Sequence, residues 1–240
     1  MVDFPYKVRV PQRPPQLVAR QRLRQQLATI RHKSLLTITA PAGYGKTSLL
    51  IDFAHDAPPL PVCWYTLDRF DADPWAFVGY VAAAVQQRFP QAMAQTQQLL
   101  GGSGAISLDV VVAALTRDIY TLGEEFALII DDWHLVDANN DISAAVAHLL
   151  TRCPNCHIIL ASRSYPSLPD LMLLLARQLL LVVDDEGLRF TPPEALAVLR
   201  ATYDASVPLD RAEALVEQTR GWITGVLLCV QASGPTPPAL

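Results

Sequence analysis

A short apolar segment, a glycine-rich turn and the start of a helix follow one another in the first quarter of the chain. Leu35–Thr39 combines apolar and β-branched residues, as a buried parallel strand does. The turn, Ala40–Gly45, leads into Lys46, Thr47 and Ser48, after which apolar residues recur at helical spacing. A strand joined to a helix in this way is a βα unit. The segment therefore predicts an α/β fold built on a parallel sheet.

The turn has the composition of a phosphate-binding loop. Backbone N–H groups of such a loop, and the positive end of the helix after it, face an anion. A lysine at the position of Lys46 neutralises the outer phosphates of a nucleoside triphosphate, and a hydroxyl at that of Thr47 ligates Mg²⁺. The usual pattern begins with glycine, where this chain has Ala40. We expect ATP or GTP to bind along Ala40, Pro41, Ala42, Gly43, Tyr44, Gly45, Lys46, Thr47 and Ser48. The alternative is an ordinary turn with its lysine in solvent.

A second apolar segment ends in two carboxylates. Phe126–Ile130 is apolar throughout, and Asp131 and Asp132 follow it. Such a strand belongs in the middle of a covered sheet, and its carboxyl end emerges where open α/β sheets bind ligands. In a nucleotide-binding protein of this kind we expect Asp131 to hold Mg²⁺ and Asp132 to orient or activate the attacking water. The alternative is a pair of solvated aspartates at a strand end.

A third strand of the same kind is expected at residues 157–161, followed by Ser162 and Arg163. An arginine at that edge can reach the γ-phosphate and report its presence. Taken by itself, however, the segment favours the other interpretation, in which Arg163 is a surface salt-bridge partner.

Composition excludes several function classes. The 240 residues are 51% hydrophobic, which is enough for a large core, and the formal net charge is −4. There is no basic stripe of the kind a DNA-binding surface needs. We interpret Arg13, Arg20, Arg22 and Arg24 as one charged face of an N-terminal helix. No apolar stretch has membrane-spanning length and no secretory leader is recognisable, so we expect a cytoplasmic protein with no membrane partner.

The cysteines invite a metal or redox interpretation. Cys153 and Cys156 form a Cys-x-x-Cys pair, but no second pair accompanies them. The pair precedes a strand, whereas a thioredoxin-like site follows one. We therefore expect a turn at Pro154-Asn155 with free thiols, rather than a zinc site.

The remaining segments alternate between strand and helix patterns. We expect strands at 35–40, 61–66, 126–131, 157–161 and 178–183. We expect helices at 16–31, 46–57, 73–89, 107–122, 141–151 and 170–176. Residues 91–104 are rich in Gln and Gly and indicate a mobile surface connection. The chain is thus predicted to be a doubly wound parallel sheet of about five strands, of the P-loop NTPase type.

Helix start signals fix several of these elements. Asp73 followed by Pro74 begins a helix whose inward stripe we expect to be Trp75, Val78, Ala82, Val85 and Phe89. In the N-terminal helix we expect Leu17, Leu23, Leu27 and Ile30 to face inward.

From residue 186 onward the pattern is helical only. Thr191 and Glu194 form a capping box, and Asp210 with Glu213 is expected to repeat it. Gly221 separates that helix from a last one at 222–230. We expect a nucleotide-binding domain at 1–185, a helical subdomain at 186–232, and a linker or artificial chain end at 233–240.

Seven motifs in this order resemble one family. They are Pro41–Thr47, Trp64–Asp68 with Asp71 and Asp73, Ile130–Leu135, Ser162-Arg163, Gln178–Leu180, Leu188–Thr191 and Gly221-Trp222. Together they are similar to the ATPase module of MalT-like, large LuxR-type transcriptional regulators, which belong to the STAND class of signalling P-loop NTPases.

The resemblance implies an ATP/ADP switch with slow Mg²⁺-dependent hydrolysis. ADP would keep a closed monomer, and ATP with an inducer of unknown identity would allow self-association. By motif position, Lys46 and Thr47 would hold phosphate and magnesium, Asp131 magnesium, Asp132 the water, and Arg163 would sense the γ-phosphate. Tyr44 would line the loop.

Two further points qualify the resemblance. Related proteins often carry proline where this chain has Ile223, so the adenine contact is left open. DNA binding would belong to domains absent from this chain. The alternative functions are a catalytic P-loop ATPase or kinase of AAA-like type, and an interaction domain with a degenerate loop.

Overall fold

The computed structural model describes residues 5–56, 58–102, 106–203 and 206–233. Apart from Ser233, the expected linker at 233–240 lies outside the described residues, as does Ala57 at the expected end of the second helix. Among the described residues, no helix combines the length and the apolar character needed to cross a lipid bilayer.

The core of the fold is a parallel sheet of five strands, as predicted. Its spatial order is β2-β3-β4-β1-β5, so the phosphate-loop strand and the aspartate-bearing strand flank β4. The strands are β1 (Leu35–Thr39), β2 (Val62–Thr66), β3 (Phe126–Asp131), β4 (Cys156–Ser162) and β5 (Leu180–Val183). In the register, Thr39 lies opposite Ser162 and Thr66 lies opposite Asp131. The carboxyl ends of these strands therefore meet at one edge.

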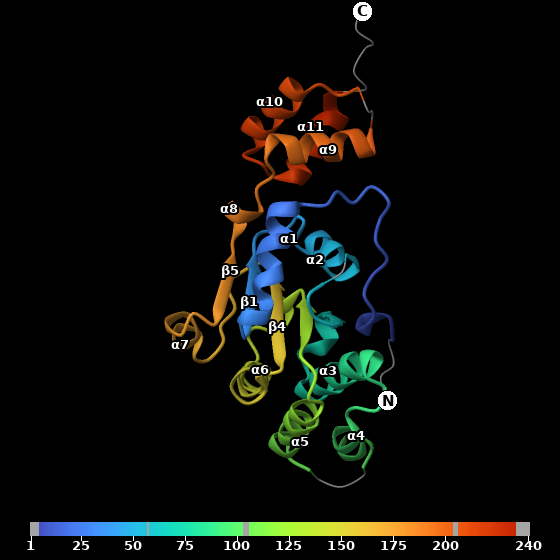
Figure 1. Ribbon diagram of the computed structural model, residues 1–240, viewed down its shortest axis with the longest axis vertical. Helices are drawn as coiled ribbons and strands as arrows, with labels where there is room; N and C mark the ends of the chain where they lie inside the picture. Colours follow the sequence, from blue (N-terminus) through green and yellow to red (C-terminus); the bar gives the residue numbers. More distant parts are fainter. Residues whose placement is uncertain (1–4, 57, 103–105, 204–205, 234–240) are drawn as a thin grey trace, which may run out of the picture.

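Helices cover both faces of the sheet (Figure 1). One apolar cluster joins the sheet to α3 (Pro74–Arg88), α5 (Leu108–Thr121) and α6 (Asn140–Arg152). A second cluster, on the other face, joins it to α1 (Gln21–Ala28), the 3-10 turn Thr29–His32 and α2 (Lys46–His55). Central strand residues are fully buried and alternate between the clusters, Leu35 in the first and Leu36 in the second. The structure is therefore a three-layer α/β arrangement.

Four further helices follow β5 and stand beyond the carboxyl edge of the sheet (Figure 1). They are α8 (Asp185–Leu188), α9 (Pro192–Thr202), α10 (Leu209–Thr219) and α11 (Ile223–Ser233). We call the last three the helical unit, because with the linker residue Phe190 they build an apolar cluster of their own. The domain boundary expected after residue 185 stays a prediction, and α8 spans that point.

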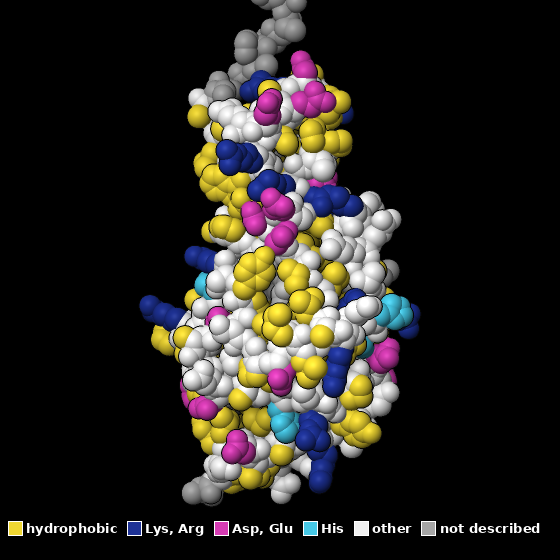
Figure 2. Space-filling view, turned by 90° about the vertical axis from the view of Figure 1, so that its left-hand side faces the viewer, with side chains coloured by type: hydrophobic (Ala, Val, Ile, Leu, Met, Phe, Trp, Pro, Cys, Tyr) yellow, Lys and Arg dark blue, Asp and Glu magenta, His cyan; other side chains and the backbone are white. Residues whose placement is uncertain are grey.

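Short elements complete the fold. They are the 3-10 turns Pro5–Val8, Arg69–Ala72 and Trp133–Leu135, and the helices α4 (Ala94–Gly101) and α7 (Leu171–Ala176). Figure 2 faces the β5 and α7 side of the molecule, where Met172, Leu173 and Leu175 of α7 are exposed. Charged side chains of both signs gather there at the junction with the helical unit.

Local signals placed most helix starts correctly. Asp73 caps α3 by accepting from the Trp75 amide, with Pro74 at the first position. The capping box of Thr191 and Glu194 begins α9. Pro154 and Asn155 form the expected turn, and the cysteines at its ends are free and buried. Among the described residues, no group of three or more His, Cys, Asp or Glu side chains is placed to hold a metal ion.

The N-terminal helix is shorter than predicted. It begins at Gln21 and not at residue 16, so Leu17 lies before it, although Leu23, Leu27 and Ile30 are buried as expected. The interpretation of Arg13, Arg20, Arg22 and Arg24 as one charged face of that helix was also wrong, because Arg13 and Arg20 lie before its first residue. Arg20 is only 4% exposed, because it makes contacts across the fold that are described below. Tertiary contacts have overridden the local helical periodicity.

The expected mobile connection at 91–104 instead contains α4, and its residues 103 and 104 lie outside the described residues. Asp118 holds this helix, since its Oδ2 accepts from the Thr96 amide at 2.9 Å and from the Thr96 hydroxyl at 2.8 Å. Met93 is buried at the helix start in a left-handed conformation. The Gln-rich composition describes only the outer side of the helix.

Two details of helix assignment were wrong. Trp75 is 38% exposed, while Phe77 and Val81 are buried in its place. Asp210 does not cap α10, because the residue at the cap position is Pro208 and it makes no side-chain cap bond. In α3 the buried face is turned around the helix relative to the predicted one. In α10 the helix begins at Leu209, before the residue that was predicted to cap it.

Candidate nucleotide-binding site

The loop between β1 and α2 has the backbone of a phosphate-binding turn. Gly43 and Gly45 have φ of +83° and +80°, a region that glycine enters without steric cost. Gly45 is also the N-cap of α2, so Lys46 is the first helical residue. The Lys46 ammonium donates to the carbonyls of Ala40 at 2.6 Å and Pro41 at 3.0 Å. The lysine therefore folds back along the loop that it follows.

Lys46 is buried at 8% exposure. Burial lowers the pKa of its ammonium, while the nearby carboxylates of Asp131 and Asp132 act to raise that pKa. A buried cation with free donor capacity beside a helix N-terminus favours an anionic ligand.

Thr47 and Asp131 lie together, as expected for a shared magnesium site. The Thr47 hydroxyl donates to Asp131 Oδ2 at 2.7 Å. Asp131 ends β3, is 1% exposed, and also accepts from the Asp132 amide at 3.0 Å. Burial raises the pKa of Asp131 to about 6; the hydrogen bond from Thr47 opposes the rise and the charge of Asp132 adds to it. Hard oxygen donors are the ligands that Mg²⁺ prefers, so this pair fits the ion.

Asp132, His134 and Arg163 lie around the same edge. Asp132 has a left-handed backbone (φ +62°), which turns the chain sharply after β3. Its carboxylate Oδ1 lies 3.8 Å from His134 Nδ1, and burial lowers the pKa of that imidazole. Arg163 follows β4 and is exposed. Sequence reasoning assigned roles to the aspartate and the arginine but none to His134, although His134 lies inside the motif Ile130–Leu135.

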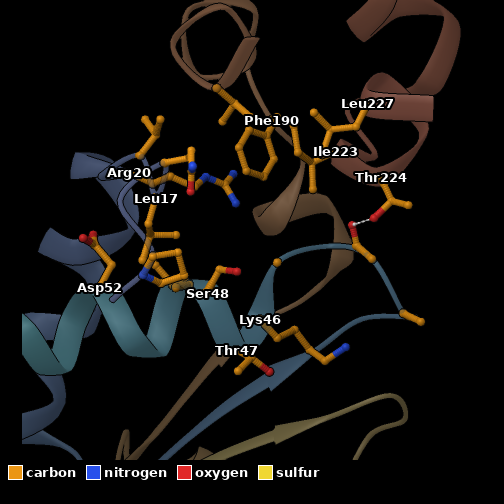
Figure 3. Close-up of a pocket in the computed structure, with 18 of the residues that line it drawn as sticks. Leu17, Arg20, Lys46, Thr47, Ser48, Asp52, Phe190, Ile223, Thr224 and Leu227 are labelled. Atoms are coloured by element: carbon orange, nitrogen blue, oxygen red, sulfur yellow. Dashed lines mark hydrogen bonds between the residues drawn. The ribbon is translucent and has the colours of Figure 1, made fainter. Parts of the chain in front are cut away.

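One cavity of about 520 Å³ connects these groups to the helical unit. Figure 3 shows its wall: Lys46 and Thr47 lie at the bottom, Leu17 and Arg20 lie on the N-terminal side, and Phe190, Ile223, Thr224 and Leu227 lie on the side of the helical unit. Asp132 and Arg163 also line it. The polar end of the cavity is thus the phosphate loop, and the other end is largely apolar.

The N-terminal segment and the helical unit meet through two arginines. The Arg20 guanidinium lies 3.8 Å from the centre of the Phe190 ring and donates to Glu194 at 3.1 Å and to the Arg189 carbonyl at 2.9 Å. Arg22 reaches the same Glu194 carboxylate at 3.0 Å. These contacts explain why Arg20 is buried, and they form one edge of the cavity.

The structure brings most of the predicted site residues to this cavity. Its wall includes Ala42, Gly43, Gly45, Lys46, Thr47, Ser48, Asp132 and Arg163. The others stand behind it. Ala40 and Pro41 accept the Lys46 bonds, Tyr44 packs against the apolar cluster of α1 and α2, and Asp131 lies behind Thr47. The functional roles of all these residues stay predictions.

The apolar end of the cavity was missed from the sequence. Leu17, Phe190 and Leu227 come from three segments far apart in the chain. Phe190 belongs to the motif Leu188–Thr191, but no pattern in the sequence brings the three residues together. The sequence offers one signal, the position of Arg20, since an arginine inside an apolar periodic segment is a candidate for a tertiary contact.

No family model matches the chain. Curated relatives are transcriptional regulators: the HTH-type transcriptional regulator MalT of Klebsiella pneumoniae is 30% identical over 226 residues, covering 94% of this chain and 25% of that protein. MalT of Cronobacter sakazakii is 32% identical over 230 residues, with the same two coverages. The chain therefore spans about a quarter of the length of the curated relatives it matches.

Solved structures with this fold include a Signal Transduction ATPase with Numerous Domains protein from Pyrococcus horikoshii. Its TM-score is 0.62 at 20% identity, and the match covers 95% of this chain and 32% of that one. Cdc6p from Pyrobaculum aerophilum has a TM-score of 0.58 at 16% identity, covering 90% of this chain and 61% of that one. These similarities establish the fold.

The sequence matches extend over nearly the whole chain and confirm the resemblance to MalT-like regulators. The solved structures that share the fold of this chain include a Signal Transduction ATPase with Numerous Domains protein. The chain is thus a relative of one segment of the MalT-type transcriptional regulators, with the fold of a STAND-class P-loop ATPase.

Proposed function

We propose that this chain is the nucleotide-binding switch module of a signal-responsive transcriptional regulator. It binds ATP and ADP with Mg²⁺ and hydrolyses ATP slowly. The observation that carries the proposal is the placement of Lys46 and Thr47 beside Asp131, at the floor of a cavity that the helical unit covers.

The groups at the phosphate end of the cavity suit an anionic ligand with its Mg²⁺ ion. The β- and γ-phosphates lie against the loop amides and the Lys46 ammonium, which exchanges its bonds to Ala40 and Pro41 for the anion. Thr47 and Asp131 would hold Mg²⁺, which neutralises phosphate charge when bound. Burial already penalises the ionised form of Asp131, and a divalent cation relieves that penalty.

Hydrolysis is assigned to the two groups at the neighbouring strand ends. Asp132 orients the attacking water, and the Arg163 guanidinium meets the charge of the γ-phosphate. Both line the cavity. We expect turnover at or below the bottom of the usual enzyme range, about 1 s⁻¹, because the role is a switch.

The base lies at the apolar end, between the N-terminal segment and the helical unit. Leu17, Ile223 and Leu227 line that end. An apolar wall suits the faces of a purine ring. Ile223 therefore has a place in the site although it replaces the proline that related proteins often carry.

Regulation of transcription, self-association in the ATP state and DNA binding are proposed for a longer parent protein. The relatives named as transcriptional regulators are about four times as long as the matched segment. DNA contact would come from domains other than this one, and the inducer is unassigned.

Thermal unfolding with Mg-ADP, Mg-ATP and Mg-GTP tests the proposal. A ligand at 100 times its dissociation constant adds about 2.7 kcal/mol of stability, which raises the Tm of a domain of this size by about 5–10 °C. Lys46→Ala is expected to abolish the shift. The absence of a shift with every nucleotide refutes nucleotide binding, and rapid steady-state hydrolysis refutes the switch.

A further inference from the structure

The turn before α11 and the first turn of that helix touch the phosphate loop directly. The Trp222 indole N–H donates to the Ala42 carbonyl at 3.1 Å. The Thr224 hydroxyl donates to the next carbonyl, that of Gly43, at 3.0 Å, and the Thr224 amide approaches the same oxygen at 3.4 Å. Two successive peptide groups of the loop are therefore held by residues about 180 positions away.

The contact is so close that it requires glycine on both sides. A Cβ at Gly43 would lie 2.5 Å from the Thr224 hydroxyl and 2.7 Å from the Trp222 indole nitrogen. A Cβ at Gly225 would lie 2.6 Å from the Trp222 ring. Real Cβ atoms do not approach other atoms this closely. Glycine at both positions is what lets the indole and the hydroxyl reach the loop.

These bonds determine where the loop amides point. In a trans peptide the C=O and the N–H on either side of the C–N bond point in opposite directions. Fixing the Ala42 carbonyl on Trp222 therefore turns the Gly43 N–H away from the helical unit. Fixing the Gly43 carbonyl on Thr224 does the same for the Tyr44 N–H. In Figure 3 the Thr224 bond lies on the opposite side of the loop from the Lys46 side chain.

We propose that Trp222 and Thr224 are positioning residues for polyphosphate binding. They act through the loop, by holding two of its amides toward the side on which Lys46 lies, so that the ligand does not have to order them. The helical unit thus contributes to the phosphate end of the site as well as covering the cavity. This inference rests on the proposed function, because it names the residues that prepare the same loop for a nucleotide.

Two variants remove one hydrogen bond each; Thr224→Val keeps the side-chain shape, whereas Trp222→Phe also makes the ring smaller. Trp222→Phe removes the indole N–H, and Thr224→Val removes the hydroxyl. Thr224→Ser keeps the hydroxyl and is the matched control. Thermal unfolding first establishes that each variant is folded. Dissociation constants for Mg-ADP and for AMP are then measured by calorimetry on the same preparations.

We expect Mg-ADP affinity to fall about fivefold for each hydrogen bond removed, the value of one neutral hydrogen bond. AMP affinity should change less than Mg-ADP affinity, and Thr224→Ser should resemble the natural protein. Equal losses for ADP and AMP would show that the two residues serve only general closure, and unchanged ADP affinity would also overturn the inference.

Amide hydrogen exchange without nucleotide gives a second, independent readout. A peptide covering residues 40–46 should exchange faster in Thr224→Val than in Thr224→Ser, while a peptide covering β3 stays unchanged. Equal exchange in the loop overturns the inference. If the natural protein binds no nucleotide, the proposed function fails, and loop exchange still decides whether Trp222 and Thr224 order the loop.

Discussion

Replacing Asp131 by asparagine should stabilise the nucleotide-free protein at alkaline pH. Burial raises the pKa of this carboxyl from 3.8 to about 6, so its ionised form is disfavoured in the folded state. The difference of about two pKa units corresponds to about 3 kcal/mol of unfolding free energy at pH 8. Asparagine is never ionised and avoids that penalty.

The hydrogen bonds reduce this gain. Asp131 accepts from the Thr47 hydroxyl and from the Asp132 amide, and asparagine has a single acceptor oxygen. Losing one neutral hydrogen bond costs about 1 kcal/mol. The net stabilisation expected for Asp131→Asn is therefore about 2 kcal/mol at pH 8, or roughly 4–8 °C in Tm.

The pH dependence carries the test. Because the folded pKa lies above the unfolded one, the penalty is absent below the unfolded pKa and grows as pH rises to the folded value. About half of it should be present at pH 5. Urea unfolding with a chelator at pH 5 and pH 8 measures this. Asp132→Asn, at a partly exposed carboxylate, is the control and should change stability less. An Asp131→Asn variant that is less stable at pH 8, or whose effect is independent of pH, would refute the reasoning.

Three further outcomes follow from contacts described above. Glu194→Ala should loosen the helical unit, because Glu194 accepts from Arg20 and Arg22; faster proteolysis between β5 and α9 checks this. Burial opposes ionisation of Glu194, yet hydrogen bonds from the Thr191 amide and Arg20 lower the pKa of Glu194 overall. The contribution of Glu194 to holding the helical unit should therefore be lost as pH falls through that lowered pKa, and the same proteolysis rate measured at decreasing pH checks this. Asp118→Ala should cost about 1–3 kcal/mol, because the Thr96 amide and hydroxyl lose their acceptor; denaturant unfolding measures the cost, and an unchanged midpoint contradicts it.

The sheet and the phosphate-loop end of the site are predictable from the sequence, because local sequence patterns specify them. Leu35–Thr39 and Phe126–Asp131 are apolar runs that only a covered parallel sheet buries on both faces. The glycines and Lys46 mark the turn that follows the first run. Because the carboxyl ends of parallel strands meet at one edge of the sheet, Asp131 and Thr47 are then expected at the same edge.

The apolar end of the site was not predictable from the sequence, because tertiary contacts position its residues. Arg20 fits a charged helix face equally well until Phe190 and Glu194 are brought to it across the fold. Likewise α4 follows from Asp118, a residue of another helix, rather than from its own Gln-rich sequence. A long-range contact made by a single side chain leaves no periodic pattern in the local sequence.

Nucleotide binding and docking of the helical unit must therefore influence each other. The unit is held at one side of the cavity by Arg20 and Arg22 on Glu194, and at the other by Trp222 and Thr224 on the loop. A ligand that binds the docked arrangement more tightly favours docking by the same factor by which docking favours the ligand. ATP and ADP differ only in the γ-phosphate, which the proposal places near Asp132 and Arg163. A ligand shifts a conformational equilibrium only through its different affinity for the two states. In the proposed switch, we therefore expect discrimination between ATP and ADP to reach the helical unit through the loop contacts of Trp222 and Thr224, because the Glu194 contacts lie away from the phosphate loop.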